Sequence, residues 1–79
     1  MNIRSIGYNS VYAGSYSFQA EAEMGVYMLV LTKSRARFWV NDECISAAPN
    51  SLIIYDDTCA RQYAADAAPL VCDWICFDA

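Results

Sequence analysis

Residues 27–57 read YMLVLTKSRARFWVNDECISAAPNSLIIYDD, and the fold class follows from this stretch. Its apolar and β-branched residues come in short runs separated by residues typical of turns, which is the pattern of consecutive β-strands. In the run ARFWV, apolar side chains at every second position indicate a strand with one buried face. The stretch therefore predicts four strands, over residues 27–32, 36–40, 43–47 and 51–55.

Three turns join these predicted strands. Residues 33–35 form a short link, which we expect to be a hairpin turn exposed to solvent. Asn41 and Asp42 tolerate positive φ angles, so this pair predicts a tight hairpin. Pro49 fixes its own φ angle at the first central position of the next turn, and Asn50 can take the left-handed conformation at the second.

The rest of the chain adds further strand patterns and little that favours helix. Residues 17–24, SFQAEAEM, contain good helix formers, but they suffice for only about two turns. Additional strands are expected over residues 8–13, 61–64 and 70–77. Six or seven short strands, with turn signals about every ten residues, predict an all-β fold of the sandwich or barrel type.

The composition predicts one small domain with more apolar surface than it can bury alone. The chain has 79 residues, which we assign to a single domain over 1–79, and 57% of them are hydrophobic. Ordinary globular domains contain about 45–50% apolar residues. A chain of this length buries only about 60–65% of the surface that its unfolded form exposes. We therefore expect the chain to associate with itself as a homo-oligomer.

The net charge of −4 argues against nucleic acid as a direct partner. Lys33, Arg35 and Arg37 are the only concentration of basic residues, and they fit a solvated turn better than a phosphate site. The N-terminus lacks the apolar run of a signal peptide. The longest nearly apolar run has eight residues, whereas about 20 are needed to span a bilayer. We therefore expect a soluble, cytoplasmic protein without a membrane partner.

The reactive side chains do not form a pattern typical of catalysis or metal binding. The four cysteines are Cys44, Cys59, Cys72 and Cys76. No two of them form a CxxC pair, so their spacing is not that of a zinc site. The chain has no histidine, so the imidazole ligands that suit iron, zinc or copper and the usual base for a cysteine nucleophile are missing. Asp56 and Asp57 are adjacent, which is more typical of a turn than of acid and base partners. We expect free thiols rather than disulfides, no metal, no cofactor and no catalytic residues.

The order of these segments resembles the N-terminal cupin-like sensor domain of AraC-family transcription regulators. The resemblance rests on residues 27–57, RQY at 61–63 and DWICF at 73–77, and it covers roughly residues 25–78. It implies a truncated cupin-like barrel or jelly-roll of antiparallel strands. Family members continue into dimerisation helices and a DNA-binding helix-turn-helix unit. These 79 residues contain neither, so we expect a partial sensor domain.

The resemblance also implies a ligand pocket lined by Tyr63, Cys72 and Trp74. Side chains alternate between the two faces of the last predicted strand, so Cys72, Trp74 and Cys76 share one face. The indole would stack on the ligand, and the hydroxyl of Tyr63 would fix the ligand's orientation. The alternative is that all three side chains fill the core. A sugar is one candidate ligand, but the thiol of Cys72 is a weak donor and the family's sugar-binding arginine falls near Ala20, which makes a strongly polar sugar less favoured.

Three hypotheses of function follow. The favoured one is a ligand-sensing and dimerisation domain of an AraC-like transcriptional regulator, in which a small-molecule effector inside the β-barrel shifts the protein towards one arrangement. The second is a stand-alone cupin that binds a small molecule or a partner without a metal. A cupin-type enzyme is the least favoured, since such enzymes hold their metal through histidines and this chain has none. We therefore predict a binding protein and not an enzyme.

Overall fold

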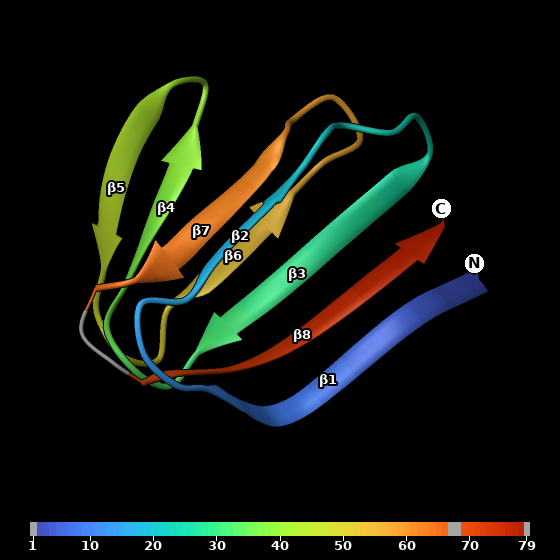
Figure 1. Cartoon of the computed structure of the whole chain (residues 1–79). Coiled ribbons are helices and arrows are strands. Elements are labelled where there is room, and N and C mark those ends of the chain that lie inside the picture. Colours follow the sequence, from blue (N-terminus) through green and yellow to red (C-terminus); the bar gives the residue numbers. More distant parts are fainter. Residues whose placement is uncertain (1, 67–68, 79) are drawn as a thin grey trace.

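In the computed structural model, which describes residues 2–66 and 69–78, all regular structure is β-strand (Figure 1). The strands are β1 (Asn2–Tyr12), β2 (Ser17–Ala20), β3 (Val26–Thr32), β4 (Ala36–Val40), β5 (Glu43–Ala47), β6 (Leu52–Tyr55), β7 (Arg61–Ala65) and β8 (Leu70–Asp78). The prediction of an all-β, antiparallel fold is confirmed. Within the described ranges, no helix has the length and apolarity that crossing a membrane requires. The cytoplasmic location stays a prediction.

The strands form two four-stranded sheets that pack face to face (Figure 1). One sheet has the order β1-β8-β3-β6 and the other β2-β7-β4-β5, and every pairing is antiparallel. β4 and β5 are the only two consecutive strands that pair with each other. All the remaining connections between consecutive strands lead from one sheet to the other. This interleaved order is that of a jelly-roll, in which two sheets share one core.

The structure has eight strands where a truncated roll of six or seven was predicted, which is a correction. The strand that the prediction lacked is β2, which has only four residues and lies at a sheet edge with β7 as its one partner. Its sequence contains helix formers, and pairing with β7 overrides that local preference. The first strand also begins earlier than predicted, at Asn2 instead of residue 8, because β8 offers a partner along most of its length.

The two turns that depend on asparagine agree with the prediction. Asn41 and Asp42 have φ angles of 51° and 66°, and they close the hairpin between β4 and β5. This is the conformation that a two-residue hairpin requires to match the twist of its strands. Asn50 has a φ angle of 68°, so it takes the left-handed conformation expected after Pro49.

The predicted hairpin at residues 33–35 is wrong. These residues lead from β3 in one sheet to β4 in the other, and the two strands do not pair. The start of β8 holds the crossing in place, since the amide of Lys33 donates to the carbonyl of Val71 at 2.8 Å and Ser34 Oγ accepts from the amide of Val71 at 2.9 Å. A short polar link between two strands fits a hairpin or a crossing equally well, and only these distant contacts distinguish them.

Inward-facing side chains from both sheets form the core. The buried cluster consists of Met28, Val30, Ala36, Phe38, Ala47, Tyr55, Tyr63, Ala65, Leu70 and Cys72. Phe38 of β4 connects the sheets, because its ring lies 6.4 Å from that of Tyr55 on β6 and 5.4 Å from that of Tyr63 on β7. Burial raises the pKa of Tyr55 to about 12, and its hydroxyl donates to the carbonyl of Gln62 at 3.0 Å. Fully burying an aromatic side chain of this size stabilises a fold by about 2–3 kcal/mol.

Thr32 is a fully buried polar residue at the end of β3. Its Oγ1 accepts from the amide of Ser51 at 3.1 Å and lies 3.1 Å from the carbonyl oxygen of Ala48, to which it donates. The backbone amide of Thr32 donates to the carbonyl of Ser51 at 2.9 Å, and its carbonyl accepts from the amide of Asn50 at 2.7 Å. Thr32 therefore fixes the turn through which the chain crosses from β5 to β6.

We expect Thr32→Val to lower the free energy of unfolding by roughly 1–3 kcal/mol, because valine keeps the shape and leaves the amide of Ser51 without its acceptor. Thr32→Ser is the matched control, since it keeps the hydroxyl and loses only a methyl group, which is worth about 0.8 kcal/mol. Urea denaturation of the three proteins makes the comparison. Equal stability of the valine variant and the wild type would show that the hydroxyl does not anchor the turn.

Candidate functional site

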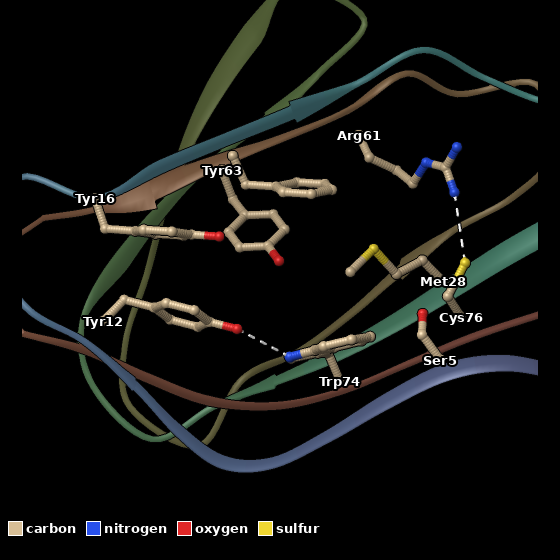
Figure 2. A pocket seen from close by; sticks show the side chains of 9 residues that line it. Ser5, Tyr12, Tyr16, Met28, Arg61, Tyr63, Trp74 and Cys76 are labelled. Carbon is tan, nitrogen blue, oxygen red and sulfur yellow. Dashed lines mark hydrogen bonds between the residues drawn. The ribbon is translucent and has the colours of Figure 1, made fainter.

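A cavity of about 150 Å³ lies between the two sheets (Figure 2). Its lining comes from both sheets and from the segment between β1 and β2: Ser5, Tyr12, Tyr16, Phe18, Met28, Arg61, Tyr63, Trp74 and Cys76. Most of these side chains are aromatic or apolar. An apolar cavity of about this volume holds one molecule the size of benzene.

The alternation of side chains along β8 places Trp74 and Cys76 in the cavity wall. The indole Nε1 of Trp74 donates to the hydroxyl of Tyr12 at 3.2 Å (Figure 2). On β1 the residue opposite Trp74 is Gly7, and a Cβ atom there would lie only 2.2 Å from Nε1. The indole therefore takes this orientation only because position 7 has no side chain.

The pairing of β1 with β8 is irregular beside Trp74. The register shifts between Gly7 and Ser10, and Asn9 within the shift has a φ angle of 50°. The amide of Asn9 donates to Asp73 Oδ1 at 2.7 Å, and Lys33 Nζ lies 3.2 Å from the same oxygen. The hydrogen bond from Asn9 and the nearby Lys33 ammonium lower the pKa of Asp73 below its usual value. These contacts hold β1 against β8 at the level of the cavity.

Stacked aromatic rings form one end of the cavity (Figure 2). The rings of Tyr12 and Tyr16 are stacked with centroids 4.1 Å apart, and those of Phe18 and Tyr63 are stacked at 5.0 Å. Burial raises the pKa of both Tyr16 and Tyr63, so their hydroxyls stay neutral at physiological pH. This end therefore offers flat apolar surfaces and neutral hydroxyl groups.

The guanidinium of Arg61 forms the other end (Figure 2). Arg61 begins β7 and is only 9% exposed. Its Nη2 donates to the carbonyl of Glu21 at 2.7 Å, and its Nη1 lies 3.7 Å from the sulfur of Cys76. Its Nε is buried and has no hydrogen-bond partner. The cavity thus combines an aromatic end with a cationic end.

Two of the three predicted site residues, Tyr63 and Trp74, line the cavity, and Cys72 does not. Cys72 is completely buried in the core, where burial raises the pKa of its thiol. The cavity extends from Trp74 towards the end of β8, so Cys76 takes the place that was predicted for Cys72. Cys72, Trp74 and Cys76 thus share the inward face of β8, and the cavity lies beside Trp74 and Cys76. The ligand-binding roles of Tyr63, Cys72 and Trp74 stay predictions.

The prediction also lacked Arg61. A signal for it was present, because Arg61 stands two residues before Tyr63 in the strand predicted over 61–64, and residues at this spacing share a face. Tyr12, Tyr16 and Phe18 had no comparable signal. Tyr12 is the last residue of β1, Tyr16 lies in the connection between β1 and β2, and Phe18 lies on β2, the strand that the prediction lacked.

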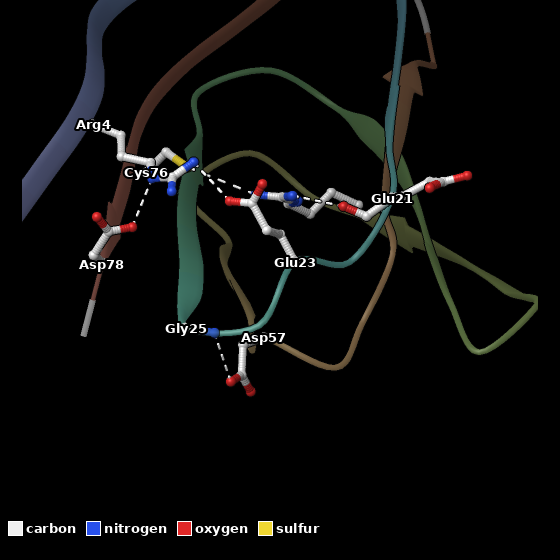
Figure 3. Close-up of polar contacts among 8 residues, drawn as sticks. Arg4, Glu21, Glu23, Gly25, Asp57, Cys76 and Asp78 are labelled. Atoms are coloured by element: carbon white, nitrogen blue, oxygen red, sulfur yellow. Dashed lines mark hydrogen bonds and ion pairs between the residues drawn. The ribbon is translucent and has the colours of Figure 1, made fainter.

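Asp56 and Asp57 do not line the cavity. Asp56 Oδ1 accepts from the amide and the hydroxyl of Thr58, which lowers the pKa of Asp56, and it stabilises a turn as predicted. Asp57 Oδ2 accepts from the amide of Gly25 at 3.0 Å (Figure 3). All four cysteines are free. In the ranges 2–66 and 69–78, no three acidic, cysteine or histidine side chains gather to hold a metal ion.

Compared with family models, curated proteins and solved structures, the chain gives no significant match. The resemblance to AraC-family sensor domains therefore stays a prediction from the sequence motifs.

We expect Gly7→Ala to displace the indole of Trp74, because the new methyl group would overlap the ring. In a Trp39→Phe background, where Trp74 is the only tryptophan, its fluorescence maximum should shift to the red. The overpacked variant should also lose roughly 1–3 kcal/mol of stability. Gly14→Ala is the control for fluorescence alone, since no atom beyond the neighbouring residues lies within 4 Å of the added Cβ, although the φ angle of 74° makes alanine strained there. An unchanged emission maximum in Gly7→Ala would contradict this placement of the indole.

Proposed function

We propose that this chain is a ligand-sensing and dimerisation domain of an AraC-like transcriptional regulator, with a small-molecule effector in the cavity between its sheets. The observation that supports the proposal most is that both sheets contribute side chains to the cavity. Its lining residues on β1, β3 and β8 face those on β2 and β7. A ligand in such a place touches both sheets at once. It can therefore favour one arrangement of the domain over another, as a sensor requires.

The lining favours binding over catalysis. Among the residues that line the cavity there is no carboxylate and no imidazole, which are the usual general acids and bases at neutral pH. Stacked rings and the half-buried indole of Trp74 instead offer large rigid surfaces that bind a flat ligand at little cost in side-chain entropy. The ligand class that fits best is a single planar ring with few polar groups.

We expect benzamide, as a probe of the cavity, to shift the indole resonance of Trp74 saturably in ¹H–¹⁵N NMR spectra. The indole of Trp39 is the internal reference, because Trp39 is not among the lining residues. Cys76→Phe should abolish the shift by filling the cavity, and Cys44→Phe, the same change at an exposed cysteine, should leave it intact. If Trp74 does not respond in the wild type, or if it responds equally in Cys76→Phe, the cavity is not a binding site.

Self-association is the second part of the proposal, and the outer face of the sheet β1-β8-β3-β6 supports it. A shallow apolar groove on this face is lined by Ile6, Gly7, Tyr8, Leu29, Leu31, Leu52, Asp73, Trp74 and Ile75. Ile6, Tyr8 and Leu52 are 67%, 77% and 59% exposed. Contiguous exposed apolar surface of this kind is typical of protein interfaces. We take a second copy of the chain as its partner.

Sedimentation at micromolar concentration should therefore give a species larger than the 8.8 kDa monomer. Leu52→Lys should shift the equilibrium to monomer, because it places a charge on the exposed apolar surface that lines the groove. Ile45→Lys is the matched control, since Ile45 is 45% exposed and lies on β5 in the other sheet. A wild-type chain that sediments only as a monomer would contradict the dimerisation part of the proposal.

A further inference from the structure

Arg61 is a buried cation with unused hydrogen-bonding capacity. A guanidinium carries five N–H donors. In this structure it has one strong acceptor, the carbonyl oxygen of Glu21 at 2.7 Å, and one weak acceptor, the sulfur of Cys76 at 3.7 Å. The Nε donor is buried and has no partner. A buried donor without a partner costs free energy, and the cost is larger when the donor carries a charge.

No carboxylate of the described chain neutralises this cation. The ion pairs in residues 2–66 and 69–78 involve Arg4, Lys33 and Arg37, and none of them includes Arg61. Glu23, on the same segment as Glu21, pairs with Arg4 at 2.7 Å, and Arg4 also holds Asp78 at 2.6 Å (Figure 3). Glu21 contributes its backbone carbonyl. The charge of Arg61 is therefore available to an anion from outside the chain.

The cavity places that anion beside a flat apolar pocket. Arg61 lines one end, and the rings of Tyr12, Tyr16 and Tyr63 lie towards the other (Figure 2). Guanidinium groups bind carboxylates through paired N–H donors, and such charge-assisted bonds are about twice as strong as neutral ones. The volume of about 150 Å³ has room for one six-membered ring.

We infer that the ligand of this cavity is a small planar carboxylate, with its ring against the aromatic side chains and its carboxylate on Arg61. The inference rests on the proposed function, because it specifies what the same cavity binds. It assigns to Arg61 the selection of an anion over a neutral molecule of equal shape.

The alternative role for Arg61 is purely structural, as a tie between β7 and the segment at Glu21. Both roles predict that removing the guanidinium lowers stability. Only the binding role predicts a change in the ratio of affinities for a charged and a neutral ligand of the same shape. The experiment therefore measures this ratio.

Benzoate and benzamide are suitable probes, since they have the same shape and differ in charge. Wild-type protein should bind benzoate at least about tenfold more tightly than benzamide, as judged by titration of the Trp74 indole resonance. Arg61→Gln should bring the ratio close to one while benzamide still binds. Arg61→Lys should retain part of the preference, because an ammonium keeps the charge and loses the paired donors. Arg35→Gln, which removes the same charge from an exposed residue, should keep the wild-type ratio.

The outcomes separate the two proposals. If neither probe binds the wild type, the proposed ligand-binding function fails and this inference fails with it. If both probes bind equally well, the cavity is a binding site but Arg61 does not select an anion, and the inference is wrong. The inference is also wrong if Arg61→Gln prefers benzoate over benzamide by the same ratio as the wild type. If that variant does not fold, Arg61→Lys decides, since an unchanged ratio there contradicts a role for the paired donors.

Discussion

The pairing of β8 on both of its edges is the constraint on which the rest of the structure depends. β8 lies between β1 and β3, so its register fixes which of its side chains face the second sheet. Opposite Cys76 and Trp74, β1 presents Ser5 and Gly7, which have little or no side chain. On the other edge, the buried Met28 lies opposite Cys76. The indole of Trp74 takes up the room at Gly7, whereas the small side chain of Ser5 borders the cavity.

The second sheet closes this space with residues that do not fit a simple core. Phe18 and Tyr63 provide stacked rings, but Arg61, on the same face of β7, brings a charge into the interior. An unfilled space forfeits dispersion contacts, and a buried charge loses its hydration. Natural proteins accept such local violations of good packing mainly at functional sites. The lost dispersion contacts and the dehydrated charge of Arg61 occur at the same place. This is the physical reason for proposing a binding site there instead of imperfect packing.

The sequence was informative wherever the structure is determined locally. The strands between residues 26 and 55 and the left-handed conformations of Asn41, Asp42 and Asn50 could be predicted, because each depends on periodicity or on the φ preference of one residue type. Apart from the hairpin of β4 and β5, which strands pair could not be predicted. The link at residues 33–35 fits a hairpin by its local pattern, and only the hydrogen bonds to the start of β8 make it a crossing between sheets.

The candidate site was predictable to a similar extent. Alternation along β8 identified the inward face, and the motif resemblance directed attention to Tyr63 and Trp74. Whether Cys72 or Cys76 borders the cavity could not be predicted from alternation, because both thiols share the inward face and each lies opposite a serine of β1. Arg61 was within reach of the same alternation argument, but a charged residue is ordinarily expected to face solvent.

Xenon tests most directly whether an apolar space lies between the two sheets. Xenon enters apolar cavities of about this size. Under xenon pressure, the ε-methyl resonance of Met28, which lines the cavity and is 4% exposed, should shift strongly in ¹H–¹³C spectra. The methyl of Met24, which is 92% exposed, should move little. Equal, small shifts at both methyl groups would contradict the account, because they would mean that the sheets enclose no such space.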